Sequence, residues 1–244
     1  KAFCLLHNGE LKMDLFKRKM SLSDGVLQGA TDSHSHVLFG VDDGIKTLED
    51  SLAVLSFLET LGIQHLWCTP HIMDDLATPT EALKARFLEL QQAYKGNIQL
   101  HLAAEYMLDS EFERRLEQGD LLPIDGDIIL IETSMNVPPY NFIEVIQNIM
   151  SKGYRPLLAH PERYRYLSMK DYEYLDSIGV FFQLNLPSLV GYYGDTARDK
   201  AVELLRKGMY KRIGSDCHRL QSIQEQYTRD ALTAEINEQL RMLL

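Results

Sequence analysis

Histidines and carboxylates that could bind metal cluster in one short stretch of the chain. The segment TDSHSHVLFGVDDG, residues 31–44, places His34 and His36 one residue apart, and Asp42 and Asp43 just ahead of a glycine. Imidazole nitrogens and carboxylate oxygens, without thiolates, suit zinc, manganese or iron at a hydrolytic site. An amphipathic helical pattern follows over residues 47–61, so these four side chains precede a helix.

Short apolar segments alternate with helical patterns along the rest of the chain. We expect strands at residues 29–33, 63–69, 98–104, 127–133, 155–159, 180–184 and 210–215. We expect helices at residues 47–61, 80–94, 110–118, 141–152, 170–177 and 196–207, and a last one from about 221 to 243. Strands that alternate with helices favour βα units and a parallel sheet. Seven such units in one domain predict an α/β barrel.

Side chains with metal-binding or acid–base chemistry stand where these strands end. In chain order they are His34 and His36, His71, Glu105, Glu132, His160, Asn185, and finally Asp216 with His218. Because the carboxyl ends of barrel strands share one face, these residues should converge there. Burying so many ionisable groups without a counter-charge is costly, so metal ions are expected. Six ligands already exceed one tetrahedral sphere and imply at least two metals; Asp43, His71 and His218 suffice for a third.

Composition limits the possible partners and the compartment. The net charge is -10, and no dense basic block exists beyond Lys17-Arg18-Lys19, which argues against a nucleic-acid partner. No run of 18 apolar residues predicts a membrane span. The 3 cysteines form no C-x-x-C pair, which argues against a disulfide framework and favours a cytoplasmic protein.

The ends of the chain suggest the domain boundaries. We expect residues 1–28 to be a leader outside the fold, with a natural start near Met13, and residues 29–244 to form a single barrel domain. The length permits one large core.

Other residues with reactive side chains fit structural roles better. A cysteine-based tyrosine phosphatase needs an arginine six positions after its thiolate. Those positions hold Glu10, Asp74 and Ile223. His65 and His101 lie inside expected strands rather than at their ends, so we expect them to be structural.

The strings DSHSH, GVDDG, CTPH, AAEYML, LIETS, AHPERY and GSDCH, in this order, resemble the PHP (polymerase and histidinol phosphatase) family. More narrowly, they resemble its manganese-dependent branch, the bacterial capsule and exopolysaccharide tyrosine-protein phosphatases. The resemblance covers about residues 30–220. It implies a distorted (β/α)7 TIM-like barrel with three divalent metals, manganese first, with zinc, iron or magnesium as alternatives.

The resemblance also implies a distribution of ligands. One metal would take His34, His36, Glu105 and Asp216; a second would share Glu105 and take Glu132 and His160; a third would take Asp43, His71 and His218. Asp42 is expected to support a ligand or form a turn.

Three further residues are expected to contact substrate. Arg163, in the string HPER, resembles the family residue that clamps the phosphate, and the alternative is a surface ion pair with Glu162. Tyr164 and Arg219 are expected to bind substrate, although the spacing of Arg219 after His218 departs from the family pattern. Loop tyrosines could line a pocket for an aromatic ring; they are Tyr140, Tyr164, Tyr166, Tyr192 and Tyr193.

The resemblance implies in-line hydrolysis of phosphotyrosine without a phosphoenzyme, with Asp216 or His218 as a source of a proton. The expected substrate is the tail of an autophosphorylating tyrosine kinase of polysaccharide assembly. Two alternatives remain open: a small-molecule phosphatase, such as one for histidinol phosphate, and a non-catalytic metal-binding partner of the kinase. An amidohydrolase is disfavoured, because Glu132 stands where such an enzyme usually has a bridging lysine. The sequence indicates no oligomeric state.

Overall fold

The expected apolar segments form the strands of a parallel sheet in residues 19–244, the part of the chain that the computed structural model describes. In sheet order the strands are β3 (His71–Ile72), β5 (Glu105–Met107), β6 (Ile128–Glu132), β7 (Arg155–Ala159), β8 (Phe181–Asn185), β9 (Tyr210–Gly214), β1 (Thr31–Ser35), β2 (His65–Cys68) and β4 (Gln99–Leu102). Each expected strand overlaps one of these. The strands are rich in Leu, Ile and Phe, as is typical of strands that are covered on both faces.

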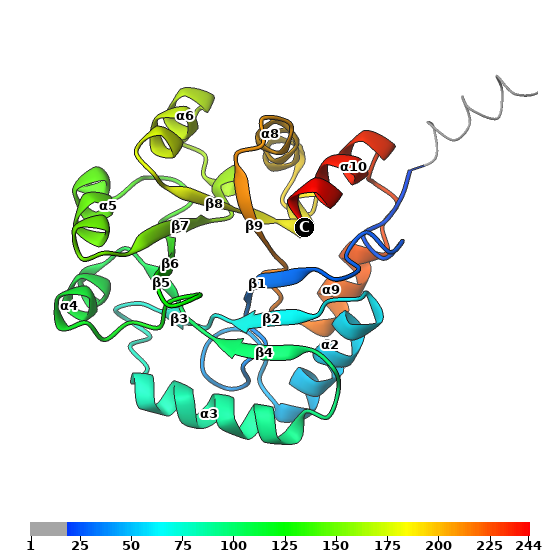
Figure 1. Ribbon diagram of the computed structural model, residues 1–244, viewed down its shortest axis with the longest axis horizontal. Helices are drawn as coiled ribbons and strands as arrows, with labels where there is room; N and C mark the ends of the chain where they lie inside the picture. The colour runs from blue at the N-terminus through cyan, green and yellow to red at the C-terminus, as the bar shows by residue number, and fades with distance from the viewer. Residues whose placement is uncertain (1–18) are drawn as a thin grey trace, which may run out of the picture.

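In two places, a single strand is broken by two residues into a pair of shorter strands. β2 and β3 are separated only by Thr69 and Pro70, and β4 and β5 only by Ala103 and Ala104. β2 pairs with β4, and β3 pairs with β5. The Ala103 N–H donates to the Cys68 carbonyl at 2.9 Å, which carries the ladder across the break. With each pair taken as one strand, the sheet closes into a distorted seven-position barrel (Figure 1), which confirms the predicted fold class.

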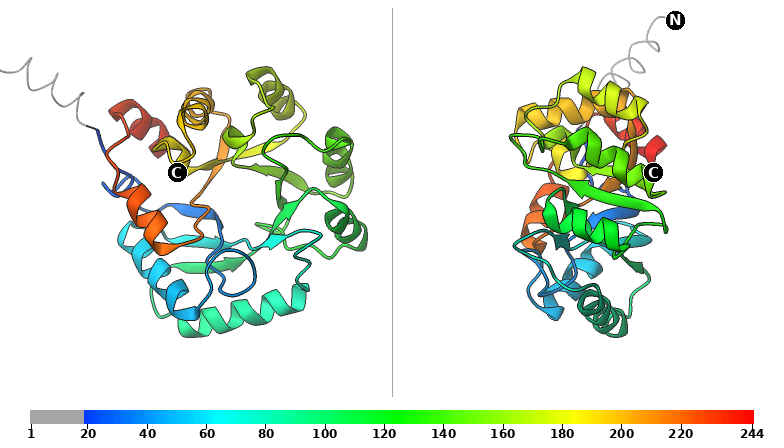
Figure 2. Two further views of the ribbon diagram at one scale, coloured as in Figure 1. Left: turned by 180° about the vertical axis from the view of Figure 1, so that it is seen from behind. Right: turned by 90° about the vertical axis from the view of Figure 1, so that its left-hand side faces the viewer.

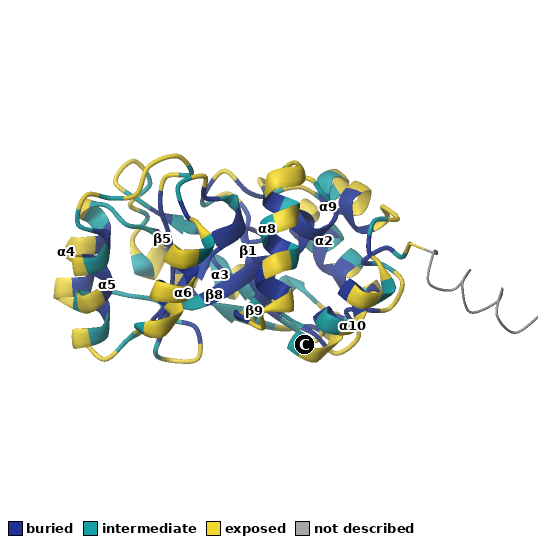
Figure 3. Ribbon diagram, turned by 90° about the horizontal axis from the view of Figure 1, so that it is seen from above, coloured by how far each residue is buried: buried dark blue, intermediate teal, exposed yellow. Residues whose placement is uncertain are grey.

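Helices enclose the outside of this barrel, as Figures 1 and 2 show. They are α2 (Leu48–Thr60), α3 (Thr80–Ala93), α4 (Ser110–Gln118), α5 (Phe142–Ser151), α6 (Met169–Ser177), α8 (Asp195–Arg206), α9 (Leu220–Tyr227) and α10 (Ala234–Leu243). Each turns apolar residues toward the strands, so buried residues lie on the inner side of the helices and exposed residues on the outer side (Figure 3).

The helices differ from the expectation in two places. The expected last helix is broken into α9 and α10, because the Thr233 side chain accepts from the Ile236 N–H at 3.3 Å and caps a new start. Two short elements were not expected: η1 (Pro161–Arg163) and α7 (Leu186–Leu189). Both directly follow a strand and carry a proline in their first turn, where its missing N–H costs nothing.

The segment before β1 belongs to the packed domain. Leu22, Val26 and Leu27 are buried in the main core, and the Met20 N–H donates to the Leu232 carbonyl at 2.8 Å. The folded domain therefore begins ahead of residue 29, where the boundary was expected. The rest of the expected leader, with the suggested start near Met13, lies outside the described residues.

The two histidines expected to be structural pack against each other. His65 Nδ1 lies 3.3 Å from His101 Nε2, and the His101 ring stacks on Trp67 with centroids 4.7 Å apart. His65 opens β2 and His101 lies inside β4, and neither belongs to the clusters of possible metal donors in residues 19–244. Their contacts therefore suit a packing role.

The contribution of residues 19–28 can be tested with one truncated side chain. Leu27→Ala should lower the free energy of unfolding by about 3 kcal/mol, because it removes a fully buried side chain from a packed core. Leu88→Ala is the matched control, since Leu88 on α3 is 52% exposed. Urea unfolding of both variants measures the difference; equal stability of the two would show that the segment is not part of the core.

Candidate metal centre and active site

The carboxyl ends of the strands hold the expected side chains close together. The end of β1 is locked to the segment after β9, because the Asp216 N–H donates to the His34 carbonyl at 2.8 Å and the His36 N–H to the Cys217 carbonyl at 3.1 Å. Two of the side chains project from strained backbone: φ is 36° at His160 and 51° at Asp216. Such positive values are rare for residues other than glycine and cluster at functional sites.

A first group of donors surrounds one point next to β1. His34 Nε2 lies 3.0 Å and His36 Nε2 3.2 Å from the same oxygen of Glu105, Oε2. The two imidazole nitrogens lie 3.1 Å from each other. Asp216 Oδ1 lies 3.6 Å from His34 Nε2 and 3.4 Å from His36 Nε2. These are the four residues that the resemblance assigns to one metal.

The electrostatic surroundings of this group suit a bound cation. Burial lowers the pKa of His34, but the carboxylates of Glu105 and Asp216 together raise it to about 9. Burial raises the pKa of Glu105, and His34 and His71 pull it well below its usual range. The buried Oε2 of Glu105 accepts no hydrogen bond within residues 19–244. A buried carboxylate oxygen amid imidazole nitrogens is a donor set that a divalent metal would fit.

A second group lies on the other side of Glu105. Glu105 Oε1 is 3.1 Å from His160 Nε2, and Glu132 Oε2 is 3.8 Å from the same nitrogen. His71 Nδ1 lies 3.1 Å from Glu105 Oε2 and 3.0 Å from Glu132 Oε1. The geometry therefore adds His71 to the expected trio, with Glu105 shared between both groups.

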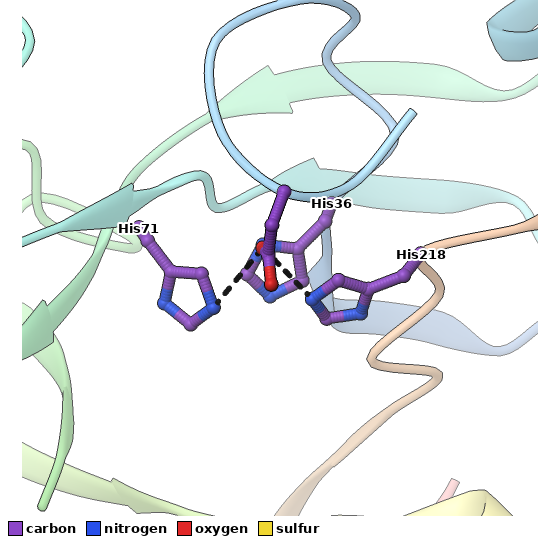
Figure 4. A group of neighbouring side chains, drawn as sticks. His36, His71 and His218 are labelled. Carbon is purple, nitrogen blue, oxygen red and sulfur yellow. Dashed lines mark ion pairs between the residues drawn. The ribbon is translucent and has the colours of Figure 1, made fainter. Parts of the chain in front are cut away.

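A third group opens toward solvent. Asp43 Oδ1 lies 3.7 Å from His71 Nε2 and 3.4 Å from His218 Nε2. Figure 4 shows His36, His71 and His218 around this carboxylate, whose side chain is 73% exposed. His218 also stacks on His36, with ring centroids 4.0 Å apart. The two ring nitrogens of His71 thus face the second and the third group.

Asp42 supports two of the histidines rather than facing the groups directly. Its Oδ2 lies 2.7 Å from His36 Nδ1 and accepts the His71 N–H at 3.1 Å. The Gly44 N–H donates to its Oδ1 at 2.9 Å. A Cβ on Gly44 would overlap the carbonyl of His36, so this tight turn requires glycine. Asp42 thereby fixes the His36 ring with Nε2 toward Glu105, as histidine ligands generally require.

Gln183, in the middle of β8, does for His34 what Asp42 does for His36. Its Oε1 lies 2.8 Å from His34 Nδ1 and accepts the His160 N–H at 3.3 Å. Its Nε2 donates to the Leu184 carbonyl at 2.6 Å. Gln183 was not expected to belong to the site; the signal in the sequence was an amide between the apolar residues Phe182 and Leu184 of β8.

Asp216 has its two oxygens in different surroundings. Oδ1 faces the imidazoles of the first group, while Oδ2 accepts from Arg163 Nη1 at 2.7 Å and from Asn185 Nδ2 at 3.0 Å. The Tyr193 hydroxyl donates to the same Oδ2 at 3.4 Å. Burial raises the pKa of Asp216, but His34 and His36 hold it well below its usual range. Asp216 is therefore a carboxylate, held in one orientation.

Arg163 does not pair with Glu162, so the alternative surface ion pair is wrong. The Glu162 carboxyl is buried and accepts from the Asn185 N–H at 3.0 Å and from the Tyr210 hydroxyl at 2.9 Å. Arg163 turns instead to Asp216, and its guanidinium lies 4.2 Å from the centre of the Tyr193 ring. Asn185 was expected at this face and Tyr193 among the tyrosines of a pocket, but neither was expected to contact Asp216.

The two other residues expected to bind substrate lie in contrasting places. Tyr164 is fully buried; its hydroxyl accepts the Thr133 N–H at 3.2 Å and its ring centroid lies 5.7 Å from that of His160. This position gives Tyr164 a packing role under His160 and leaves it no surface for a substrate, contrary to the expectation. Arg219 is exposed and lines a pocket of about 480 Å³ beside Asp43 and His218.

The role of Gln183 can be tested through metal affinity. Gln183→Leu should weaken metal binding about 10- to 100-fold, because His34 loses the acceptor that orients its ring. Gln183→Glu should retain more affinity, since it keeps an acceptor for His34. Competition with a chelator measures both variants. If circular dichroism shows that Gln183→Leu is folded and the variant binds metal as tightly as the unmutated protein, Gln183 does not orient His34.

Comparison with known proteins places this geometry in a family. A family model described as "Capsular polysaccharide synthesis, CpsB/CapC" matches residues 30–234. The chain is 28% identical to the tyrosine-protein phosphatase CpsB of Streptococcus pneumoniae, over 78% of this chain and 84% of that protein. It is 27% identical to the tyrosine-protein phosphatase YwqE of Bacillus subtilis (strain 168), over 82% of each.

A solved structure shares the fold. It comes from work on YwqE of Bacillus subtilis and CpsB of Streptococcus pneumoniae, described as metal-dependent tyrosine phosphatases. The TM-score is 0.69 at 24% identity, over 87% of this chain and 86% of that one. Within residues 19–244, no helix has the length and apolar character needed to cross a membrane. With a family model that spans most of the barrel, the chain belongs to the CpsB/CapC family of capsular polysaccharide synthesis.

Proposed function

We propose that this protein is a metal-dependent protein-tyrosine phosphatase that acts in capsule or exopolysaccharide synthesis. The observation that carries the proposal is the pairing of a buried His and carboxylate cluster with Arg163, whose guanidinium adjoins it through Asp216. Such a site combines ligands for divalent metals with a fork of N–H donors for a phosphoryl group. The relatives named tyrosine-protein phosphatases support this choice of reaction.

The metals of the proposal are three divalent ions, with manganese the first choice. His34, His36, Glu105 and Asp216 would hold one; Glu105, Glu132 and His160, with His71 beside them, a second; Asp43, His71 and His218 a third. When bound, such ions supply Lewis-acid charge to phosphoryl oxygens and lower the pKa of water.

Arg163 is proposed to bind the phosphoryl group. Within residues 19–244 its one hydrogen bond to another side chain is from Nη1 to Asp216, so its remaining N–H groups can face a ligand. Its contact with the Tyr193 ring helps to hold the guanidinium in place. Donors held in place in this way stabilise the charge that develops on the equatorial oxygens in the transition state.

The proton for the leaving group has two candidate sources, Asp216 and His218. Both oxygens of Asp216 are already engaged, and its pKa is held low, so it is a poor acid. His218 lies at the edge of the pocket with its side chain 30% exposed, but binding of the third metal ion would compete with proton donation by its imidazole. A phenolate leaving group needs less protonation than an alkoxide, so the demand on His218 is modest.

The proposed substrate is the phosphotyrosine-bearing tail of a kinase of polysaccharide assembly, in the cytoplasm. Arg219, exposed beside the centre, would contact it. The runner-up is a small-molecule phosphatase of the same fold. Parallel assays on a phosphotyrosyl peptide and on histidinol phosphate separate the two: the proposal expects the peptide to have the higher kcat/KM. A clear preference for histidinol phosphate would favour the small-molecule phosphatase. Activity on neither compound would favour a non-catalytic partner of the kinase.

The chemistry predicts that the cysteines are dispensable and the metals are not. Cys68 and Cys217 are buried, and burial raises the pKa of the Cys217 thiol to about 12, which leaves almost no thiolate to act as a nucleophile. Cys68→Ser and Cys217→Ser should keep most activity, and a chelator should abolish it until metal is restored. Loss of activity in either variant with normal metal content would contradict a metal-dependent reaction.

Arg163 should affect turnover but not metal content. Arg163→Ala should lower kcat about a hundredfold, or about 3 kcal/mol, since a transition-state donor is lost. Asp216 keeps its bonds from Asn185 and Tyr193, so metal content should stay unchanged. Arg163→Lys should restore only part of the rate, because an ammonium cannot donate as a fork. Kinetics on the phosphotyrosyl peptide with metal analysis tests this; unmutated kcat/KM in Arg163→Ala would refute the clamp.

A further inference from the structure

A pocket of about 480 Å³ opens from the third group of the metal centre toward α9. Asp43, Asp216 and His218 line its floor. One wall consists of Tyr192 and Tyr193, and the other includes Arg219, Gln221 and Ser222. The walls come from different parts of the barrel: the segment between α7 and α8, and the start of α9. Pockets of this size commonly hold small organic ligands.

The tyrosine wall is built from two rings held at right angles. Tyr193 is fixed against the centre by its hydroxyl, which donates to Asp216 Oδ2, and by the Arg163 guanidinium over its face. The Tyr192 ring meets Tyr193 edge-on, with centroids 4.9 Å apart and planes at 84°. Ser222 Oγ donates to the Tyr192 hydroxyl at 3.2 Å, which ties this wall to α9. Tyr192 nevertheless stays 52% exposed and lines the pocket, so its side chain is open to contact with a ligand.

This wall stands beside the place proposed for the phosphoryl group. Arg163, the proposed phosphate donor, contacts both Asp216 and Tyr193, and Asp216 and Tyr193 also line the pocket. A phosphoryl group bound at Arg163, beside the metal ions that Asp216 and His218 would hold, lies next to this pocket, so its ester oxygen can point into it. The group attached to that oxygen has room there, in contact with aromatic rings.

We propose that this pocket receives the aromatic ring of an aryl phosphate and that Tyr192 determines the preference for aryl over alkyl esters. The proposal rests on the phosphatase function proposed above. An aromatic ring against Tyr192 gains an aromatic pair and buries apolar surface. A short alkyl group in the same position reaches little of Tyr192 and gains neither.

A second groove with tyrosines provides the contrast. It lies between α5 and α6, and its lining includes Tyr140, Tyr166 and Tyr174 but none of the side chains of the metal centre. Tyr174, on α6, is 50% exposed, close to the value for Tyr192. Tyr174→Ala is therefore a matched control: it removes an equally exposed tyrosine away from the proposed ring site.

The experiment compares two inhibitors that cannot be hydrolysed, phenylphosphonate and methylphosphonate, on the metal-loaded enzyme. In the unmutated protein, phenylphosphonate should inhibit about fivefold more strongly, as expected for one aromatic pair. Tyr192→Ala should remove this difference by weakening phenylphosphonate alone. Tyr192→Phe should keep it, because the ring remains and only the bond from Ser222 is lost. Tyr174→Ala should keep it in full.

The outcomes separate this inference from the function on which it rests. Equal inhibition by both phosphonates in an active unmutated enzyme would overturn the ring pocket and leave the phosphatase function standing. So would an unchanged preference in folded Tyr192→Ala, or a preference lost equally in Tyr174→Ala. If Tyr192→Ala does not fold, the unmutated protein and Tyr192→Phe decide, since both must prefer phenylphosphonate. An enzyme inactive on both aryl and alkyl phosphates would instead overturn the function and the pocket together.

Discussion

The carboxylate of Glu105 is the group around which the site is arranged. It is fully buried, with Oε2 3.0 Å from His34 Nε2 and 3.1 Å from His71 Nδ1, and Oε1 3.1 Å from His160 Nε2. A buried charge of this kind costs several kcal/mol unless it is compensated. Glu105 opens β5, after the interruption at residues 103–104 that separates β4 from β5. The break in the strand and the position of the shared carboxylate are thus parts of one local structure.

The surrounding residues convert flexible side chains into fixed ones. Asp42 and Gln183 each hold the Nδ1 side of one histidine, so that both Nε2 atoms face Glu105. Asn185 joins two networks, because its side chain donates to Asp216 and its N–H to buried Glu162. Burial raises the pKa of Glu162 to about 7. Placing this carboxyl group inside the barrel end therefore costs free energy of folding. The closed apolar barrel has to offset that cost and the strained backbone at His160.

The sequence predicts the fold and the convergence of ligands because both follow from local patterns. Alternating periodicities mark the strands, and each strand end places its polar residue on one face, which is why His34 and Asp216 could be expected to meet. Contacts within that face depend on three-dimensional detail. Gln183 lies 149 residues from His34, and no spacing rule connects them. Likewise, Arg163 had Glu162 beside it in the chain, but the turn at His160 sends their side chains in different directions, one to Asp216 and one into the core. Tyr164, the next residue after this turn, is also buried in the core.

The central claim is that buried Glu105 is shared between metal ions. Anomalous diffraction from crystals loaded with manganese, collected at the manganese edge, tests it most directly. The account predicts two or three peaks at the carboxyl ends of the strands, two of them within ligand distance of Glu105, about 2 to 2.5 Å. A single four-coordinate ion closed off from solvent, or peaks that leave Glu105 without a metal, would contradict it.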